Sequence, residues 1–302
     1  MLKKYSYRGV EWYDAEAPTP DDLAQLARTY HLSEEIVHDI SQGSPTQKIE
    51  LHDSCIYIAV RFPLLGPDST NDLREVVFII GKDFLISVHS GTYKPIHEIS
   101  KIFDVSPKES KKTTIHAGML LFFIMRHLYA SLEESLSILS AELGQIEKRI
   151  FSGEEHSMVE RISRTNRRLL HLRGSLKPHE NLLSSLESAG KIFFGEKYLY
   201  YLSSIKSEWH KVWSTVEDIG EALNLLKQTN DSLLSTKTSD TMRALTLMAL
   251  VTFPLTLLAG IFGMNVTALP IVGRDNDFWI ILSIMAAGTL GMVAYFKHRK
   301  WF

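Results

Sequence analysis

Two long apolar runs near the C-terminal end dominate the pattern of hydrophobic and polar positions. They cover residues 244–262 and 278–296, and neither run contains a charged side chain. Each has about nineteen residues, close to the ~20 that an α-helix needs to cross the hydrocarbon core of a bilayer. The connecting residues 263–277 include Gly, Asn, Pro and charged residues, which favour an aqueous turn. The pattern therefore predicts two membrane spans joined by a short loop.

The alternative is a helical hairpin buried in the core of a soluble protein. Buried helices of soluble proteins rarely exclude charge over two such lengths at once, so we favour the membrane. Cationic side chains support this interpretation, because Lys237 and Arg243 precede the first run and residues 297–300 follow the second. The loop has one arginine, Arg274. The positive-inside rule predicts that both termini are cytoplasmic and that the loop lies outside. We expect the protein to reside in the cell (inner) membrane.

Before these runs, residues 1–105 combine strand and helix signals typical of an α/β domain. Thr19 and Ser33 can cap helices that extend to Arg28 and Ile40. Short β-branched and aromatic runs predict strands over residues 55–62, 75–80 and 84–89, with a turn at residues 81–83 between the last two. We expect an α+β protein that begins with a cytoplasmic α/β domain.

From the polar segment 106–112 onward, the hydrophobic period changes from two to about three and a half, which indicates helices. The first stripe consists of Leu132, Leu136, Leu139, Leu143, Ile146 and Ile150. A second helix begins near Glu155 and continues until Pro178 and Gly190 disturb the pattern. A third helix begins near Tyr198. Because no proline interrupts the third before Pro254, we expect it to continue into the first span. The predicted domains are residues 1–105, a helical coiled-coil stalk at 106–243, and a transmembrane pore domain at 244–302.

We expect the first two stripes to pack within one subunit and the third helix to approach its symmetry mates. Two spans cannot enclose an aqueous path, so transport requires several copies around an axis. One face of the first span, read at alternating steps of three and four, consists of Met242, Leu245, Ala249, Phe253, Thr256 and Gly260. The alternative for this face is ordinary packing on neighbouring helices.

No carboxylate lies on this predicted pore-lining face. A neutral lining cannot replace the hydration shell of a small divalent ion such as Mg²⁺, which gives up its waters reluctantly, so any such ion is expected to cross in hydrated form. In that case Met242, Leu245 and Phe253 act as hydrophobic constrictions that exclude water when closed, and Thr256 supplies a ring of hydroxyl groups.

Composition and motifs exclude several other classes of function. The formal net charge of -2 shows no basic surplus, so nucleic acid is not an expected partner. The one cysteine, Cys55, cannot form an intramolecular disulfide, and we expect it to be a small core side chain. We find no zinc-protease motif, phosphate-binding loop or nucleophile elbow, so we expect neither an enzyme nor a cofactor. The first residues lack the apolar stretch of a cleavable signal.

The residues TMRALTLMALVTFPLTLLAGIFGMNV, the second span and the tail KHRKWF together resemble the CorA-type family of magnesium transporters. The family signature is Gly-Met-Asn, here Gly263, Met264 and Asn265. The resemblance implies a funnel-shaped homopentamer that carries divalent cations, with Mg²⁺ favoured. It also implies that Asn265 and the Gly263 carbonyl form a selectivity ring for the hydrated ion and that Met242 and Leu245 form the cytoplasmic constriction. Intracellular Mg²⁺ bound between soluble domains would close the pore.

The chemistry of the motif agrees with this position, because Gly263 permits a helix end and Asn265 offers an uncharged amide oxygen. A plain helix C-cap is the alternative for the tripeptide alone. The loop departs from the magnesium transporters, since it has no Glu after the motif and its only acids are Asp275 and Asp277, which can attract cations.

The pair Asn265-Val266 is similar to the zinc-transporting ZntB branch. A Zn²⁺, Co²⁺ or Ni²⁺ transporter, with or without proton coupling, is therefore an alternative to a Mg²⁺ channel. The second predicted helix is also basic where a magnesium sensor is expected to be acidic, although a solvated face explains its arginines as well: Arg161, Arg164, Arg167, Arg168 and Arg173. The sequence does not identify the carboxylates of a regulatory metal site. A non-conducting, membrane-anchored coiled-coil scaffold or sensor is the alternative of another class.

Overall fold

A computed structural model describes residues 2–7, 9–44, 46–64, 73–91, 93–105, 116–264, 271, 273 and 276–299. The chain divides into two compact units, Met1–Gln228 and Thr229–Phe302, and each is described by itself. The finer division into domains at residues 105 and 243 stays a prediction.

The first unit contains a six-stranded sheet of order β1-β2-β6-β5-β4-β3. Its strands are β1 (Leu2–Tyr7), β2 (Val10–Glu16), β3 (Lys48–Leu51), β4 (Ile56–Pro63), β5 (Leu73–Ile80) and β6 (Phe84–His89). β2 and β6 pair in parallel, and the other neighbours pair antiparallel. The three predicted strands correspond to β4, β5 and β6. A side chain at Gly81, in the turn after β5, would meet the Phe84 ring at 2.1 Å, so this hairpin needs glycine.

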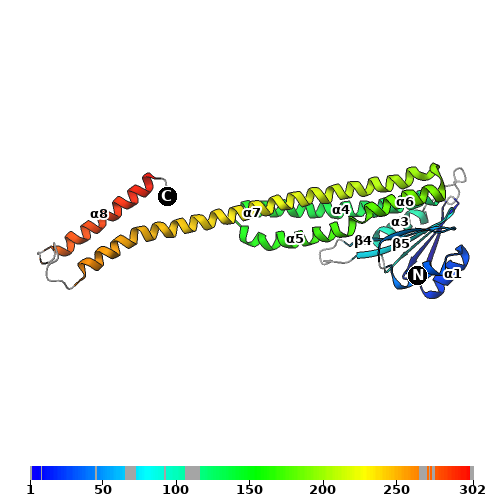
Figure 1. Cartoon of the computed structure of the whole chain (residues 1–302), viewed down its shortest axis with the longest axis horizontal. Helices are drawn as coiled ribbons and strands as arrows, with labels where there is room; N and C mark the ends of the chain where they lie inside the picture. Colours follow the sequence, from blue (N-terminus) through cyan, green and yellow to red (C-terminus); the bar gives the residue numbers. More distant parts are fainter. Residues whose placement is uncertain are drawn as a thin grey trace. The chain divides into compact units, whose positions relative to one another are not determined.

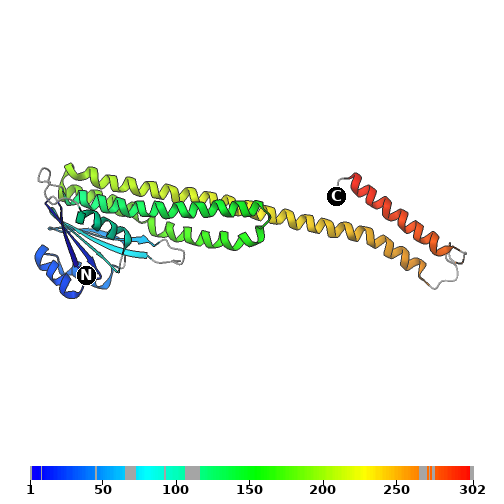
Figure 2. The same cartoon turned by 180° about the vertical axis from the view of Figure 1, so that it is seen from behind.

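Helices cover both faces of the sheet (Figures 1 and 2). α1 (Pro20–Tyr30) and α2 (Glu34–Gln42) lie on one face, where Leu26 and Ile36 pack in one core with Cys55 and Tyr57. Both helices have the predicted caps, since the side chains of Thr19 and Ser33 accept hydrogen bonds from the first turns. Cys55 is buried, and this burial raises the pKa of its thiol, as expected for a core side chain.

Longer helices cover the opposite face of the sheet. They are α4 (Ala117–Phe151), α5 (Glu155–Leu176) and α6 (His179–Phe194), and α3 (Lys94–Val105) packs on α4. All six leucine and isoleucine positions of the first predicted stripe lie in α4 and are buried within this chain. The second predicted helix ends before Pro178, as expected. Gly190 does not disturb a helix; it lies inside α6, where a side chain would meet Leu202 at 2.0 Å.

A buried histidine fastens the start of α6 to the sheet. Tyr129 of α4 donates its hydroxyl proton to Nδ1 of His179 at 2.9 Å, and Nε2 of His179 lies 3.0 Å from the carbonyl oxygen of Arg61 in β4. Because a carbonyl only accepts, Nε2 carries a proton, and in the neutral ring Nδ1 is then free to accept from the Tyr129 hydroxyl. Burial lowers the pKa of His179 to about 4, which agrees with a neutral imidazole.

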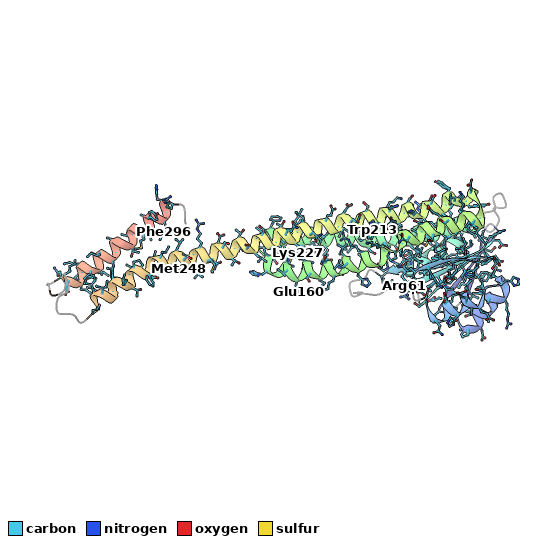
Figure 3. All side chains as sticks on the ribbon, viewed as in Figure 1. Arg61, Glu160, Trp213, Lys227, Met248 and Phe296 are labelled. Carbon is cyan, nitrogen blue, oxygen red and sulfur yellow. The ribbon has the colours of Figure 1, made fainter. Side chains whose placement is uncertain are left out.

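The basic surface of α5 is largely paired. Glu142 of α4 lies 2.8 Å from Arg168 and 4.0 Å from Arg161, and Arg164 pairs with Glu160 along α5 at 2.8 Å. Figure 3 shows Glu160 on this helix and Arg61 on the sheet. Arg161 and Arg168 therefore pair α5 with α4, and Arg164 forms an ion pair within α5. These ion pairs balance much of the basic charge of this helix.

The last two helices are the long α7 (Leu199–Phe262) and α8 (Asp277–His298), and the 3₁₀ turn η1 (Glu196–Tyr198) precedes α7. α7 contains 64 residues and includes Pro254 without ending there. The third predicted helix therefore continues into the first apolar run without a break, as expected.

Candidate ion-conduction site

The apolar runs of α7 and α8 are almost entirely exposed within the chain. Only 6% of the apolar window of α7 and 0% of that of α8 is buried. A helical hairpin in the core of a soluble protein would be mostly buried, so this alternative does not fit. Both helices are long and apolar enough to cross a bilayer.

Within the second unit, α8 runs back antiparallel to the end of α7 (Figures 1 and 2). One face of each helix is shielded. On α7 the shielded or half-shielded residues are Leu247, Val251, Pro254, Leu255, Leu258 and Phe262. On α8 they are Ile281, Met285, Thr289, Met292 and Phe296. Each set recurs at steps of three and four, as expected for two helices that pack against each other.

All six residues of the predicted pore-lining face of α7 are exposed within the chain. Met242 and Phe253 are 62% and 76% exposed, whereas Leu247 on the shielded face is 4% exposed. Leu245, Ala249, Thr256 and Gly260 are exposed as well. At 3.6 residues per turn, this face and the shielded face point roughly 170° apart. Figure 3 labels Met248, which belongs to neither set, on α7 and Phe296 on α8.

Threonine hydroxyl groups on this part of α7 bond to the helix itself. Oγ1 of Thr256 donates to the carbonyl oxygen of Thr252 at 2.9 Å. Oγ1 of Thr252 donates to the carbonyl of Met248 at 2.9 Å, and Oγ1 of Thr246 to that of Met242 at 2.8 Å. The hydroxyl protons of these three threonines therefore point toward backbone carbonyl groups of α7.

α7 ends beside the Gly-Met-Asn tripeptide. The amide of Gly263 donates to the carbonyl of Ala259 at 2.9 Å, and a side chain at Gly263 would meet the same oxygen at 2.9 Å. A side chain at Gly260, one turn earlier, would meet nothing within 4 Å, so only Gly263 of these two requires glycine for space. Met264 is exposed. Asn265, the predicted centre of the selectivity ring, lies outside the described residues.

Of the two predicted loop acids, Asp275 also lies outside the described residues. Asp277 begins α8, where its carboxylate accepts hydrogen bonds from the amides of Gly273 at 3.2 Å and Phe278 at 2.7 Å. A carboxylate at a helix N-terminus is favourable because of the helix dipole. Asp277 thus has a local structural role, and its attraction of cations stays a prediction.

A family model described as "CorA-like Mg2+ transporter protein" matches residues 7–298. The chain belongs to the CorA family. CorA proteins are channel-type transporters, so the chain is a divalent-cation transporter and not an enzyme.

Individual relatives agree with this assignment. The chain is 28% identical over 306 residues to the "Cobalt/magnesium transport protein CorA" of Thermotoga maritima, covering 95% of this chain and 84% of the relative. The solved CorA magnesium transporter of Methanocaldococcus jannaschii superposes with a TM-score of 0.83 at 20% identity, over 100% of this chain and 95% of the other. The ZntB cytoplasmic domain of Vibrio parahaemolyticus gives a TM-score of 0.62 at 13% identity, over 78% and 98%. These structures share the fold: a sheet-containing N-terminal domain and a long helix, with two C-terminal apolar helices in the full-length protein.

Sequence reasoning found the exposed face of this CorA chain but missed the face that packs on α8. Leu247, Val251, Leu255, Leu258 and Phe262 repeat at steps of three and four, but the exposed face has the same spacing, so the sequence does not say which stripe packs on α8. A regulatory metal site is a different case. Among the described residues, no group of three or more His, Cys, Asp or Glu side chains is placed to hold a metal ion.

Proposed function

We propose that this CorA chain forms a homopentamer in which five copies of α7 surround an axis and carry Mg²⁺ into the cytoplasm. The observation that carries the proposal is the exposed face of α7, which points away from α8 along the whole apolar run. The names of the relatives support the cation, since they include magnesium and cobalt.

Cyclic symmetry around an axis is compatible with both the packed face and the exposed face of α7. One side of α7 packs on α8, so the opposite side can face an axis while α8 lies on the lipid side. The exposed face begins with Met242 and ends at Gly260, one turn before the Gly-Met-Asn tripeptide. An axis beside this face would therefore be lined from the cytoplasmic end to the outer end by the same six positions of every copy.

The lining determines the state of the ion. Met242, Leu245, Ala249 and Phe253 offer no ligand to a bare cation, and Mg²⁺ keeps its waters in preference to such a lining. The ion would cross hydrated. Met242 and Leu245 lie at the cytoplasmic end of the face, where a narrow apolar ring would exclude water in a closed pore.

At the outer end, Gly263, Met264 and Asn265 would form the selectivity ring. The need for glycine at position 263 supports this role, because a Cβ there would lie 2.9 Å from the Ala259 carbonyl oxygen at the point where α7 ends and the tripeptide begins. Asn265 would offer its amide oxygen to the waters of the ion. Asp275 and Asp277 would raise the local cation concentration.

CorA proteins reside in the inner membrane, and we propose that both termini of this chain are cytoplasmic. The cationic groups support this orientation. Lys297, His298, Arg299 and Lys300 follow α8, and Arg243 precedes the first apolar run, whereas the connecting loop has Arg274 beside two acids. Intracellular Mg²⁺ bound between soluble units would then close the pore.

Flux through purified protein tests conduction. Liposomes containing a magnesium-sensitive dye should show uptake with the wild type and lose it with Asn265→Ala. Ser283→Ala is a matched control, because Ser283 is an exposed polar residue of α8 outside both the lining and the tripeptide. If the wild type and Asn265→Ala take up Mg²⁺ equally, the proposed selectivity ring is wrong. If no metal is taken up by the wild type, the non-conducting scaffold or sensor is favoured.

The transported metal and the gate need separate tests. The likeness to a ZntB domain keeps zinc as the second candidate, so the uptake assay should be repeated with Zn²⁺, Co²⁺ and Ni²⁺, with and without a proton gradient. Zn²⁺ uptake that follows the gradient while Mg²⁺ is ignored would overturn the metal assignment. For the gate, millimolar Mg²⁺ should protect the soluble unit from limited proteolysis, and unchanged cleavage contradicts regulation by bridging.

A further inference from the structure

A buried carboxylate and a buried imidazole meet between the parallel strands β2 and β6. Asp14 of β2 is 7% exposed, and His89 of β6 is 4% exposed. Nε2 of His89 lies 3.1 Å from Oδ1 of Asp14, at the end of the ladder, whose last residue pair is Glu16 and His89. Neither side chain belongs to the proposed conduction path, so this pair needs an explanation of its own.

The partners of the His89 ring determine where its protons lie. Nδ1 is 2.8 Å from the carbonyl oxygen of Gly91, which only accepts, so Nδ1 carries a proton. Oδ1 of Asp14 is also an acceptor when the carboxyl group is ionised. Contact between Nε2 and Oδ1 therefore requires a second proton between them. With that proton the pair is an imidazolium beside a carboxylate, or an imidazole beside a carboxylic acid, and its net charge is zero in both forms.

Two further side chains hold Asp14 in this position. The hydroxyl group of Ser87 donates to the same Oδ1 at 2.8 Å, and the indole Nε1 of Trp12 donates to Oγ of Ser87 at 3.0 Å. Both Trp12 and Ser87 are buried. If the shared proton were lost, an anionic carboxylate and the lone pair of Nε2 would face each other in a buried site, which is unfavourable.

The charges on β2 favour the proton-bound form. Burial by itself lowers the pKa of His89, but the hydrogen bond and charge of Asp14, the Gly91 carbonyl and the charge of Glu16 together raise it above its ordinary value. The folded chain therefore holds this proton more tightly than an exposed histidine does.

Other elements around His89 contribute less charge. From β5, the guanidinium of Arg74 lies beside Gly91 and opposes protonation, more weakly than the two carboxylates of β2 favour it. The ring of Tyr93 lies 6.5 Å from that of His89, and burial raises the pKa of its hydroxyl group, so Tyr93 is neutral. In α4, which packs on β6, the one ionisable buried side chain near the sheet is Tyr129, bonded to His179. The ionisable side chains of α3 are Lys94, His97, Glu98, Lys101 and Asp104.

We propose that Asp14 and His89 form a pH switch that holds the end of β6 against β2 while they share a proton and loosens it when the solution becomes alkaline. Beyond this pair, the amide of Ala17 donates to the carbonyl of His89 at 2.8 Å, and the ladder ends. Through Gly91, the switch also holds the residues that lead from β6 toward α3. The role belongs to the first unit and does not depend on the proposed pore.

The direction of the effect follows from the raised pKa. Below about pH 6.5 the closed and the open forms both bind the proton, and the stabilisation is complete. As pH rises further, the open form loses its proton first, so stability falls until the pH passes the pKa of the closed form. Protection of the strand ends against amide exchange should therefore fall by up to about tenfold for each pH unit in this window.

Hydrogen exchange of the full chain in detergent, followed by mass spectrometry from about pH 6 to about pH 9 and corrected for intrinsic exchange rates, measures this window. Protection should fall with pH in residues 10–17 and 84–91 and stay constant in residues 56–63 of β4. Asp14→Asn should abolish the pH dependence, because an amide has protons for both Nε2 and the second lone pair of Ser87 Oγ. His38→Gln is the matched control, since His38 is an exposed histidine of α2, and should behave like the wild type.

Each outcome supports or overturns the switch. Wild-type protection of residues 84–91 that does not vary with pH overturns it, whatever the variants do. A pH dependence that survives in Asp14→Asn, or that disappears in His38→Gln, assigns the titration to another group and also overturns it. If circular dichroism shows that Asp14→Asn does not fold, His89→Gln takes its place, because glutamine cannot titrate and should likewise remove the pH dependence. Failure of cation uptake would overturn the proposed pore and leave this result unaffected.

Discussion

Both units of this chain contain helices with the same spacing of apolar residues, but these residues are buried in one unit and exposed in the other. In Met1–Gln228, leucine and isoleucine stripes at steps of three and four are covered by the chain's own elements, as in α4. In Thr229–Phe302, a stripe with the same spacing is bare along α7. Trp209 of the first unit is 1% exposed, and Trp279 of the second is 64% exposed. The first unit completes its own core, whereas the second leaves the apolar runs of its two helices almost entirely uncovered by the chain.

Several buried polar side chains of the first unit have their hydrogen-bond partners inside that unit. His179 has a partner at each ring nitrogen, and Nε2 of His89 lies 3.1 Å from the carboxylate of Asp14. The indole of Trp209 donates to the carbonyl of Leu176 at 3.0 Å. Changes in this unit should therefore alter folding, and changes on the bare face of α7 should alter transport.

Removing one tryptophan from each unit tests this contrast most strongly. Trp209→Ala leaves a cavity and an unpaired carbonyl, so we expect it to lower the free energy of unfolding by about 3–5 kcal/mol. Trp279→Ala should change it by less than about 0.5 kcal/mol, because an exposed side chain contributes little. Chemical denaturation of the full chain in detergent, followed by circular dichroism, measures both. Equal losses would contradict the contrast.

His179 provides a second test, through pH. The pKa of its imidazole is about 4 in the folded chain and about 6.5 when exposed. Between these values the unfolded chain binds the proton and the folded chain does not, so stability falls as pH falls from about 6.5 to about 4. The difference amounts to about 3 kcal/mol. His179→Gln cannot titrate, so its unfolding free energy should depend less on pH over this range. Parallel curves for wild type and variant would show that His179 is not buried in its neutral form.

The sequence predicted the helices and spans better than the sheet, for a physical reason. Helical periodicity and apolar length are local signals, and they were sufficient for α4, α7 and α8. β1 and β3 are edge strands with the charged residues Lys3, Lys4, Lys48 and Glu50, which hides the alternation that identifies a buried strand. β2 pairs in parallel with β6, which lies far along the chain. Because no short turn connects these two strands, the local sequence gives no signal that they pair.

The candidate site was predictable in part. The spacing of Met242, Leu245 and Phe253 predicted a face, and the structure leaves that face bare. Spacing alone could not show that the opposite face packs on α8, since both faces are apolar. It also could not show that Thr256 donates its proton to Thr252, because hydroxyl partners depend on a side-chain rotamer. Asn265 stays a prediction from the resemblance.

The smallest expected effect concerns the part of α7 just before the first apolar run. Residues 235–246 are exposed on every side, and the hydroxyl groups of Thr236, Thr238 and Thr241 donate to carbonyls four residues earlier. Threonine is a poor helix former by about 0.5 kcal/mol relative to alanine, and no packing of the chain compensates for it here. Amide hydrogen exchange should therefore be faster over residues 235–246 than over the packed residues 209–223.

Replacing all three threonines by alanine should slow exchange in this segment by about tenfold, since three increments of about 0.5 kcal/mol add to roughly 1.5 kcal/mol. Thr215→Ala is the control, because Thr215 makes the same bond to Lys211, at 3.1 Å, in the part of α7 that belongs to the first unit. There tertiary packing determines exchange, so the control should leave protection of that segment nearly unchanged. Uniform protection along wild-type α7, measured by mass spectrometry, would mean that neighbouring subunits cover residues 235–246 and that the bare part of the helix starts later.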